Sequence, residues 1–397
     1  MIACENVFPT KIIFGKGTRL EIGKRLKEYT NNVLFIYGGG SIKRTGLYDE
    51  ITDSLKDNGI EFTELGGIKS NPTLEKVNDA ITLIRDNKID FVLGVGGGSV
   101  LDTAKAAALG ALYEGDVWDF FCGKAKIERA LAVATILTIP GTGSETSPNV
   151  VISNVDTKEK IGIYDTVLRP VFSIMDPELC VTIPKSQVSN GVYDMLSHTM
   201  ERYFTNTIHT DIIDGVSEGV MRGIIKNGLI AYEDPTDVNA WAELMVGSDF
   251  SHNGMTGFGR ECDWSNHGME EVISGIYDCP HGAGIAVTTL AWMKYVYKRH
   301  IPMFVQFAVN VMGCSGSFRE QEKLALDGIR ALEDFTKKMG LPTTMKELGV
   351  DDSRFEFMAK RAVGYKGDSL GTLEKLTWQD VLNIYRIANE ENVEVLS

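Results

Sequence analysis

The first 180 or so residues alternate continuous apolar runs with stretches of helical character. Three such runs, at 33–37, 90–95 and 131–139, each end in a glycine-rich turn. Strands that are apolar throughout, rather than at every second position, are typical of a parallel sheet covered by helices on both faces. Two shorter runs, at 150–153 and 160–164, predict a hairpin around a turn at 156–158. A third, at 171–175, predicts the final strand.

Beyond residue 183 the apolar positions repeat at the helical period, and no central strand is expected. The predicted helices cover 185–206, 211–230, 237–258, 268–276, 285–299 and 319–339. A chain of 397 residues exceeds one ordinary core. We therefore expect two domains, an α/β domain with a parallel, Rossmann-like sheet (1–183) and an all-helical domain (184–397), with a ligand site in the cleft between them.

Composition narrows the choice of partners and compartment. The chain has 40 basic and 54 acidic residues, and this net charge of −14 argues against binding nucleic acid or an anionic membrane. No apolar run is long enough to span a bilayer, and the first residues do not resemble a signal peptide. Its six cysteines are scattered without a CxxC pair, which favours reduced thiols in the cytoplasm.

The three glycine turns predict a shared anionic ligand, because glycine lets backbone N–H groups approach a phosphate closely. After Gly97 and Gly98, we expect Ser99 to cap a helix, with Asp102 at the reciprocal position. The G-x-G-x-x-G fingerprint is absent, because Ser99 stands where its third glycine would be. The alternative is three tight turns at sheet ends with no ligand.

Four side chains predict a metal site. Asp194 and His198 lie four residues apart and share one helix face, and His267 and His281 follow later in the chain. One carboxylate and three imidazoles suit Fe(II) or Zn(II) and leave room for a substrate oxygen. Cys262 or Cys279 would be a softer alternative ligand.

With these features in view, the chain resembles the iron-containing (group III) alcohol dehydrogenase family, especially its bacterial butanol dehydrogenases and NADPH-dependent aldehyde reductases. The resemblance spans nearly the whole chain. Its motifs include FPTKIIFGKG (8–17), YGGGSIKRTG (37–46), SNPTLEKV (70–77), GGGSVLDTAKA (96–106), TIPGTGSETSPN (138–149), IMDPELCVTIP (174–184), DMLSHTMERYFTN (194–206), DWSNHGMEE (263–271) and CPHGAG (279–284).

The resemblance implies a dehydroquinate synthase-like architecture in which a metal and a nicotinamide cofactor serve one reaction. It assigns the metal to Asp194, His198, His267 and His281. It assigns the cofactor to Gly38, Gly39, Ser41, Asn71, Gly97, Gly98, Ser99, Asp102, Thr138, Thr142, Asn149, Lys160, Leu179 and Thr182. Family members often have asparagine where this chain has Ser147, so Asn149 is the nearby amide that we retain.

Cofactor choice is predicted from the first glycine turn. Relatives that use NAD often carry an acid for the ribose 2′-hydroxyl, whereas this chain has Gly39 there and no carboxylate before Asp49. Glycine amides, Ser41 and the cations Lys43 or Arg44 would instead receive a 2′-phosphate. NADP(H) is therefore favoured over NAD(H); the alternative is a turn that accepts either.

A second departure concerns the proton. Many relatives have a histidine four residues after the third ligand, at the position of Glu271 in this chain. Glu271 either carries the proton itself, orients a ligand histidine or faces water. His252 either lines the cleft or packs in the core.

These features together predict reversible hydride transfer between NADP(H) and a primary alcohol or aldehyde, such as butanol and butanal. Aromatic residues expected near the site, namely Tyr203, Phe258, Trp264 and Tyr277, suit such a substrate. The alternatives are an NAD(H)-dependent butanol dehydrogenase, a dehydroquinate synthase-like lyase, a metal hydrolase and a non-catalytic NADP(H)-binding protein. The resemblance also implies a homodimer.

Overall fold

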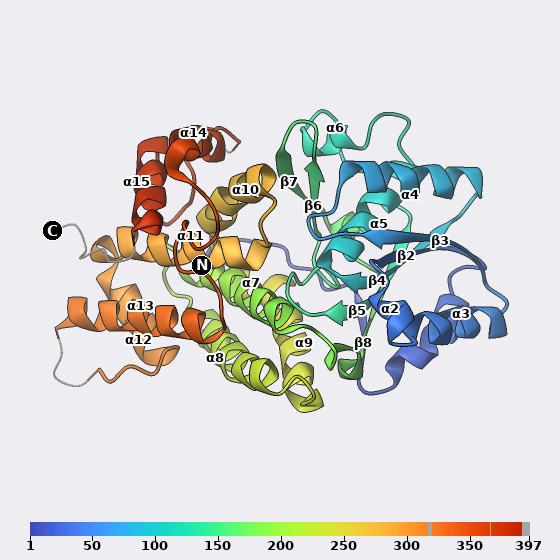
Figure 1. The fold of residues 1–397 in the computed structure, drawn as a ribbon, viewed down its shortest axis with the longest axis horizontal. Coiled ribbons are helices and arrows are strands. Elements are labelled where there is room, and N and C mark those ends of the chain that lie inside the picture. The colour runs from blue at the N-terminus through green and yellow to red at the C-terminus, as the bar shows by residue number, and fades with distance from the viewer. Residues whose placement is uncertain (317–319, 366, 391–397) are drawn as a thin grey trace. The chain divides into compact units, whose positions relative to one another are not determined.

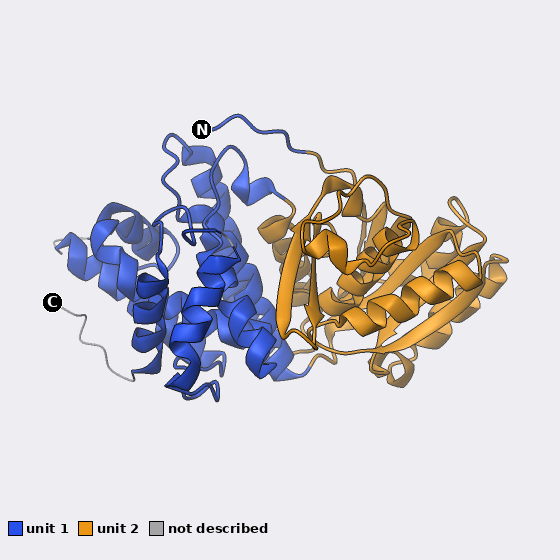
Figure 2. Ribbon diagram, turned by 90° about the horizontal axis from the view of Figure 1, so that it is seen from above, with its two compact units in different colours: residues 1–6, 184–234, 254–397 blue, residues 7–183, 235–253 orange. Residues whose placement is uncertain are grey.

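The computed structural model describes residues 1–316, 320–365 and 367–390. The chain divides into two compact units, coloured separately in Figure 2. The sheet unit comprises residues 7–183 and 235–253, and the helical unit comprises residues 1–6, 184–234 and 254–397. One helix between residues 235 and 253 thus belongs to the sheet unit, although it follows the first helices of the helical unit in the chain.

A parallel sheet of six described strands forms the centre of the sheet unit, in the order β1-β8-β5-β4-β2-β3. The strands are β1 Lys11–Phe14, β2 Asn32–Gly38, β3 Glu61–Ile68, β4 Phe91–Gly97, β5 Ala132–Ile139 and β8 Phe172–Met175. A separate antiparallel hairpin consists of β6 Asn149–Asn154 and β7 Glu159–Tyr164.

Helices cover both faces of this sheet, as Figure 1 shows for α4 and α5 on one side and α2 and α3 on the other. Along β2, Leu34 and Ile36 pack with α4 and α5, while Val33 and Phe35 pack with α1 and α3. The helices are α1 Ile22–Leu26, α2 Ser41–Arg44, α3 Leu47–Asp57, α4 Leu74–Asp86, α5 Gly98–Ala111, α6 Trp118–Phe121 and α9 Val238–His252, with short 3₁₀ helices η1 Thr18–Glu21, η2 Thr166–Leu168 and η3 Pro177–Cys180. Burial on both faces explains why the inner strands β2, β4 and β5 are continuously apolar.

The strand order places the glycine turns together. The chain leaves β2 for the outer strand β3 and returns to β4 on the other side of β2 before continuing to β5. The strands are parallel, so the turns after β2, β4 and β5 lie at one end of the sheet. Ligands of open α/β sheets bind at such a change of winding direction.

The helical unit contains α-helices and short 3₁₀ helices. They are α7 Lys185–Tyr203, α8 Asp211–Glu233, η4 Met255–Gly257, α10 Ser265–Tyr277, α11 His281–Val296, η5 Tyr297–Arg299, α12 Ile301–Asn310, α13 Gln321–Lys338, η6 Asp352–Arg354, α14 Phe355–Gly364 and α15 Trp378–Asn389. Within the described residues we find no helix with both the length and the apolar character needed to cross a bilayer.

The predicted fold class is confirmed, and so are the three long strands, the hairpin and the last strand of the sheet. The sequence analysis missed the outer strands β1 and β3 and the helices α12, α14 and α15. It extended one helix through 237–258, whereas α9 ends at His252 and a 3₁₀ turn follows. Residue 319, the expected start of the last predicted helix, lies outside the described residues.

Candidate active site

Helix α7 carries the first two predicted metal ligands on one face. Asp194 and His198 are one turn apart, and the Oδ1 atom of Asp194 lies 3.6 Å from Nε2 of His198. Both side chains are almost fully buried. The i, i+4 spacing therefore brings the two groups together as expected.

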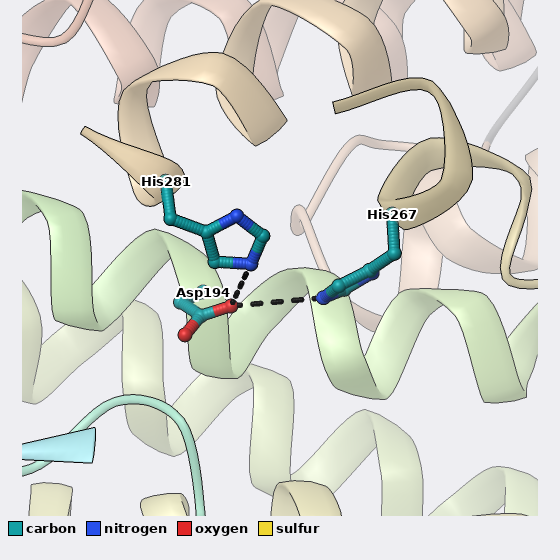
Figure 3. Close-up of side chains that lie close together, drawn as sticks. All are labelled: Asp194, His267 and His281. Atoms are coloured by element: carbon teal, nitrogen blue, oxygen red, sulfur yellow. Dashed lines mark ion pairs between the residues drawn. The ribbon is translucent and has the colours of Figure 1, made fainter. Parts of the chain in front are cut away.

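Two further histidines face the same carboxylate oxygen. His267 lies on α10 and His281 is the first residue of α11; their Nε2 atoms are 3.7 and 3.5 Å from Asp194 Oδ1. Figure 3 shows both imidazole rings pointing toward Asp194. Tetrahedral ligands bound at about 2.1 Å to one zinc ion would be about 3.4 Å apart. The distances around Asp194 match that spacing.

The donor atoms at this centre fit a divalent cation. Asp194 Oδ1 and His267 Nε2 are buried and make no hydrogen bond in the described structure, a costly arrangement unless another group binds them. Asp194, His267 and His281 form a group whose ligand atoms all lie within 4.8 Å of one another. His198 borders this group, with its ring stacked 4.7 Å from that of His267.

Two buried glutamates pair with two of the candidate ligand histidines. Glu201 Oε2 pairs with Nδ1 of His267, and Glu270 Oε2 pairs with Nδ1 of His281. Glu201 also accepts the backbone N–H of Asn266 at 2.6 Å. Carboxylates in this position fix the ring orientation and raise the basicity of a metal-binding imidazole.

The sequence analysis missed both glutamates, although their spacing was a usable signal. Glu201 lies seven residues after Asp194 and three after His198, on the same helix face. Glu270 likewise lies three residues after His267 on α10. An acid one turn from a ligand histidine, on the same helix, was the pattern to look for.

Charge around His267 favours a cation. Burial lowers the pKa of His267, but Glu201 and Asp194 outweigh burial and raise this pKa to about 10. The same negative surroundings would hold a divalent ion in place of the imidazole proton.

The aromatic ring of Trp264 packs beside His198 and His267. Its ring meets those of His198 and His267 edge-on, with centroids 6.2 and 5.3 Å apart. The guanidinium of Arg202 lies 4.4 Å from the Trp264 ring centroid. Trp264 has φ 61°, a left-handed conformation that is costly for a bulky side chain.

Two of the other expected aromatic residues donate hydrogen bonds to acids outside the candidate ligand set, and the third is exposed. Tyr203 donates its hydroxyl to Glu218 at 2.9 Å, and Tyr277 donates to Asp351 at 3.4 Å. Phe258 is exposed.

Glu271 is half-buried on α10, one position after Glu270. Glu270 rather than Glu271 pairs with a ligand histidine in the contacts described above. A proton-carrying role of Glu271 stays a prediction.

The second glycine turn opens α5 without a side-chain cap. Gly97 is the N-cap residue, and Ser99 lies within the helix, so the expected Ser99 cap is wrong. The carboxylate of Asp102 does not form the reciprocal capping bond that was expected at the start of α5. It instead accepts hydrogen bonds from Ser144 Oγ at 2.6 Å and from the backbone N–H of Val151 at 3.0 Å.

The second and third turns approach each other closely. A Cβ atom at Gly98 would lie 2.3 Å from Oγ1 of Thr142, so only glycine fits there. This contact brings two of the predicted cofactor-binding positions together, as a ligand spanning both turns requires.

The remaining predicted cofactor residues all lie in the sheet unit. Gly39, Ser41 and Thr182 are exposed, Lys160 is buried, and Asn71 adopts a left-handed backbone with φ 52°. Asn149 begins β6, with its amide against His252. The half-buried positions among the predicted cofactor residues are Gly38, Asn71, Gly97, Gly98, Ser99, Thr138, Thr142, Asn149 and Leu179.

Two family models match consecutive parts of the chain. A family model described as iron-containing alcohol dehydrogenase matches residues 9–177, and the C-terminal model of the Fe-containing alcohol dehydrogenase family matches residues 188–389. The chain belongs to the iron-containing alcohol dehydrogenase family. It is thus an oxidoreductase of the alcohol dehydrogenase and aldehyde reductase type, and membership implies a metal and a nicotinamide cofactor. This assignment favours the predicted oxidoreductase over the lyase and hydrolase alternatives.

Individual relatives are similar along almost their whole length. NADH-dependent butanol dehydrogenase A of Clostridium acetobutylicum is 39% identical over 97% of this chain and 99% of that protein. The NADPH-dependent aldehyde reductase YqhD of Escherichia coli is 32% identical over 96% of this chain and 98% of its own. The crystal structure of NADH-dependent butanol dehydrogenase A from Thermotoga maritima matches with a TM-score of 0.95 at 42% identity, covering 98% and 99% of the two chains.

Proposed function

We propose that this dehydrogenase transfers hydride reversibly between NADP(H) and a primary alcohol or its aldehyde, with butanol and butanal as the representative pair. The observation that carries the proposal is the convergence of three imidazole Nε2 atoms on Asp194 Oδ1, a buried oxygen without a hydrogen bond. The names of the relatives, which include butanol dehydrogenases and an aldehyde reductase, support this substrate class.

Each part of the proposed site has its own task. The ligand set would hold an iron or zinc ion, and such an ion would supply Lewis-acid polarisation of the substrate oxygen. Asp194 is the single carboxylate in this set, so its negative charge would offset one of the two positive charges of a divalent ion. Glu201 and Glu270 pair with Nδ1 of His267 and His281 and so leave the Nε2 atoms of both rings for metal binding.

The glycine turns serve the other reactant. Backbone N–H groups after β2, β4 and β5 are suited to the phosphates of a dinucleotide, whose nicotinamide supplies the hydride. Fixing the cofactor contributes proximity and orientation rather than new chemistry. Trp264 gives the substrate region an apolar surface beside the ligands.

The first turn supports NADP(H) as the preferred cofactor. Gly39 and Ser41 are exposed and carry no acid to repel a 2′-phosphate. Lys43 is also exposed, and its ammonium lies 4.4 Å from the centroid of the Tyr48 ring and 4.0 Å from Glu64 Oε2. NAD(H) is the competing assignment, because several relatives are named NADH-dependent.

Two further proposals concern assembly and compartment. A homodimer is supported by the edge strand β1, which in the described sheet pairs with β8 alone and exposes Ile12 and Phe14. A cytoplasmic location is supported by six cysteines that are all free thiols.

Metal analysis combined with cofactor oxidation tests the proposed function. The purified protein is assayed for bound iron and zinc, and for NADPH and NADH oxidation with butanal. We expect metal-dependent turnover, with higher kcat/KM for NADPH, and loss of both metal and turnover in His267→Ala. Full metal content and rate in His267→Ala would contradict the ligand set. No cofactor oxidation by the metal-loaded protein across a panel of aldehydes would contradict the reaction.

A further inference from the structure

The third glycine turn belongs to a loop at 140–148 that leads from β5 into β6. Within the loop, the backbone N–H groups of Thr146 and Ser147 donate to the carbonyl of Gly143 at 3.1 and 2.9 Å. Side chains from α9 and α5 supply further contacts. The loop is thus held by elements that lie far from it in sequence.

Helix α9 binds the beginning and the middle of the loop. The hydroxyl of Ser248 accepts the backbone N–H of Gly141 at 3.1 Å, and Asp249 Oδ1 accepts the hydroxyl of Thr146 at 2.6 Å. Ser248 is fully buried, and Asp249 is 4% exposed. Buried polar contacts of this kind fix geometry strongly, because breaking one leaves its partner without water.

The same helix binds the end of the loop through His252. His252 lies one helical turn after Ser248, and its Nε2 atom pairs with the side-chain amide of Asn149. Gly143 lies directly against the helix with φ +65°; a Cβ atom there would be 2.4 Å from Cβ of His252. The loop therefore packs against α9 at a distance that only glycine permits.

Helix α5 also binds the loop. The ammonium of Lys105, which is fully buried, donates to the carbonyl oxygens of Ser147 and Asn149 at 3.0 and 2.9 Å. Asp102 accepts the hydroxyl of Ser144. Buried charges add little net stability, since desolvation offsets their pairing, so a defined loop conformation is the main gain.

We propose that Ser248, Asp249 and His252 are positioning residues, through which α9 holds the third glycine loop in the conformation that binds the nicotinamide dinucleotide. The inference rests on the proposed function, because it takes this loop to be part of the cofactor site. These residues act through the loop, and none of them needs to touch the cofactor.

Cofactor binding by Asp249 variants tests the inference. Dissociation constants for NADPH and NADH are measured by fluorescence titration of the metal-loaded protein. Asp249→Ala removes the acceptor for Thr146 and should raise the dissociation constant about tenfold to hundredfold. Asp249→Asn keeps an acceptor oxygen, so its dissociation constant should stay within about threefold of the wild-type value. Glu243→Ala, at an exposed position on the same helix, is the matched control and should bind as the wild type does.

Two readouts separate positioning from a general loss of structure. Asp249→Ala should keep the wild-type metal content, because the ligands belong to the helical unit. Its KM for the cofactor should rise while kcat at saturating cofactor stays within about threefold. Where Asp249→Ala does not fold, Ser248→Ala carries the test and should weaken binding about threefold to tenfold.

Three results would overturn the inference. Wild-type affinity in a folded Asp249→Ala or Ser248→Ala variant would show that the loop needs no hold from α9. Equal weakening in Asp249→Asn and Asp249→Ala would show that accepting the Thr146 hydrogen bond is not the cause. Failure of the wild type to bind either cofactor would remove the proposed function and this inference together.

Discussion

The carboxylate of Glu201 pairs with Nδ1 of His267, and Glu201 lies on α7, the helix that also carries Asp194. One helix therefore carries both a candidate ligand and a carboxylate that orients a candidate ligand on another helix. Glu201 is 1% exposed, so its charge is poorly screened by water.

Replacing Glu201 with glutamine should weaken metal binding about tenfold, and replacing it with alanine up to about a hundredfold. Glutamine can still accept from the imidazole but no longer raises its basicity. Competition with a chelator of known affinity measures the change. Glu261→Gln, at an exposed position, is the control. Unchanged metal affinity in both Glu201 variants would contradict the orienting role.

Removing the cations of the first turn should change cofactor preference. In the double variant Lys43→Ala with Arg44→Ala, kcat/KM for NADPH should fall about tenfold, because a charge-assisted contact to the 2′-phosphate is lost. The kcat/KM for NADH should stay within about twofold of the wild-type value. The double variant Lys24→Ala with Lys56→Ala, at two other exposed positions of the sheet unit, makes the same change in net charge and is the control. Equal losses with both cofactors would contradict a 2′-phosphate site.

The proposed role of Glu271 predicts a change in the pH profile. Glu271→Gln cannot exchange a proton, so kcat for butanal reduction should lose one titrating limb and fall about tenfold to a hundredfold at its optimum. Metal content is measured in parallel and should not change. An unaltered pH profile would assign proton transfer to water or another group.

Buried Glu145 predicts a pH-dependent stability. Burial raises its pKa to about 7, although Ser248 and Lys105 lower it in part. Between the ordinary value of 4.5 and about 7, the folded protein binds more protons than the unfolded chain. Stability should therefore fall as the pH rises through this range.

Glu145→Gln should remove that dependence. The free energy of unfolding of the variant, relative to the wild type, should grow by on the order of 2 kcal/mol between pH 5 and pH 8. Urea unfolding at four pH values in this range measures it, with the exposed Glu114→Gln as the control. Parallel pH dependences in the wild type and Glu145→Gln would refute the expectation.

The central strands could be predicted because burial on both faces leaves a continuous apolar run. The outer strands gave no such signal. In β1, Ile13 is buried while Ile12 and Phe14 are exposed, and β3 is mostly half-buried or exposed and contains Gly66 and Gly67. Their pairing depends on neighbouring strands that a local pattern does not reveal.

The ligands of the candidate metal centre could be proposed because histidines are few and Asp194 and His198 have helical spacing. The spacing of Glu201 and Glu270 from His198 and His267 marked them as candidates, but it did not reveal that they pair with His267 and His281, because that depends on which helix faces meet. For the same reason His252 was left between core and cleft, whereas the structure pairs it with Asn149.

The position of α9 in the chain has a consequence for how the protein is made. All three glycine turns are synthesised well before residues 235–253, which complete the sheet unit. A fragment ending at residue 183 would contain the whole parallel sheet and yet lack Ser248, Asp249 and His252. During translation, the contacts between the third turn and α9 can form only after α9 has been synthesised. Anyone transplanting the sheet unit into another protein has to carry that distant helix with it.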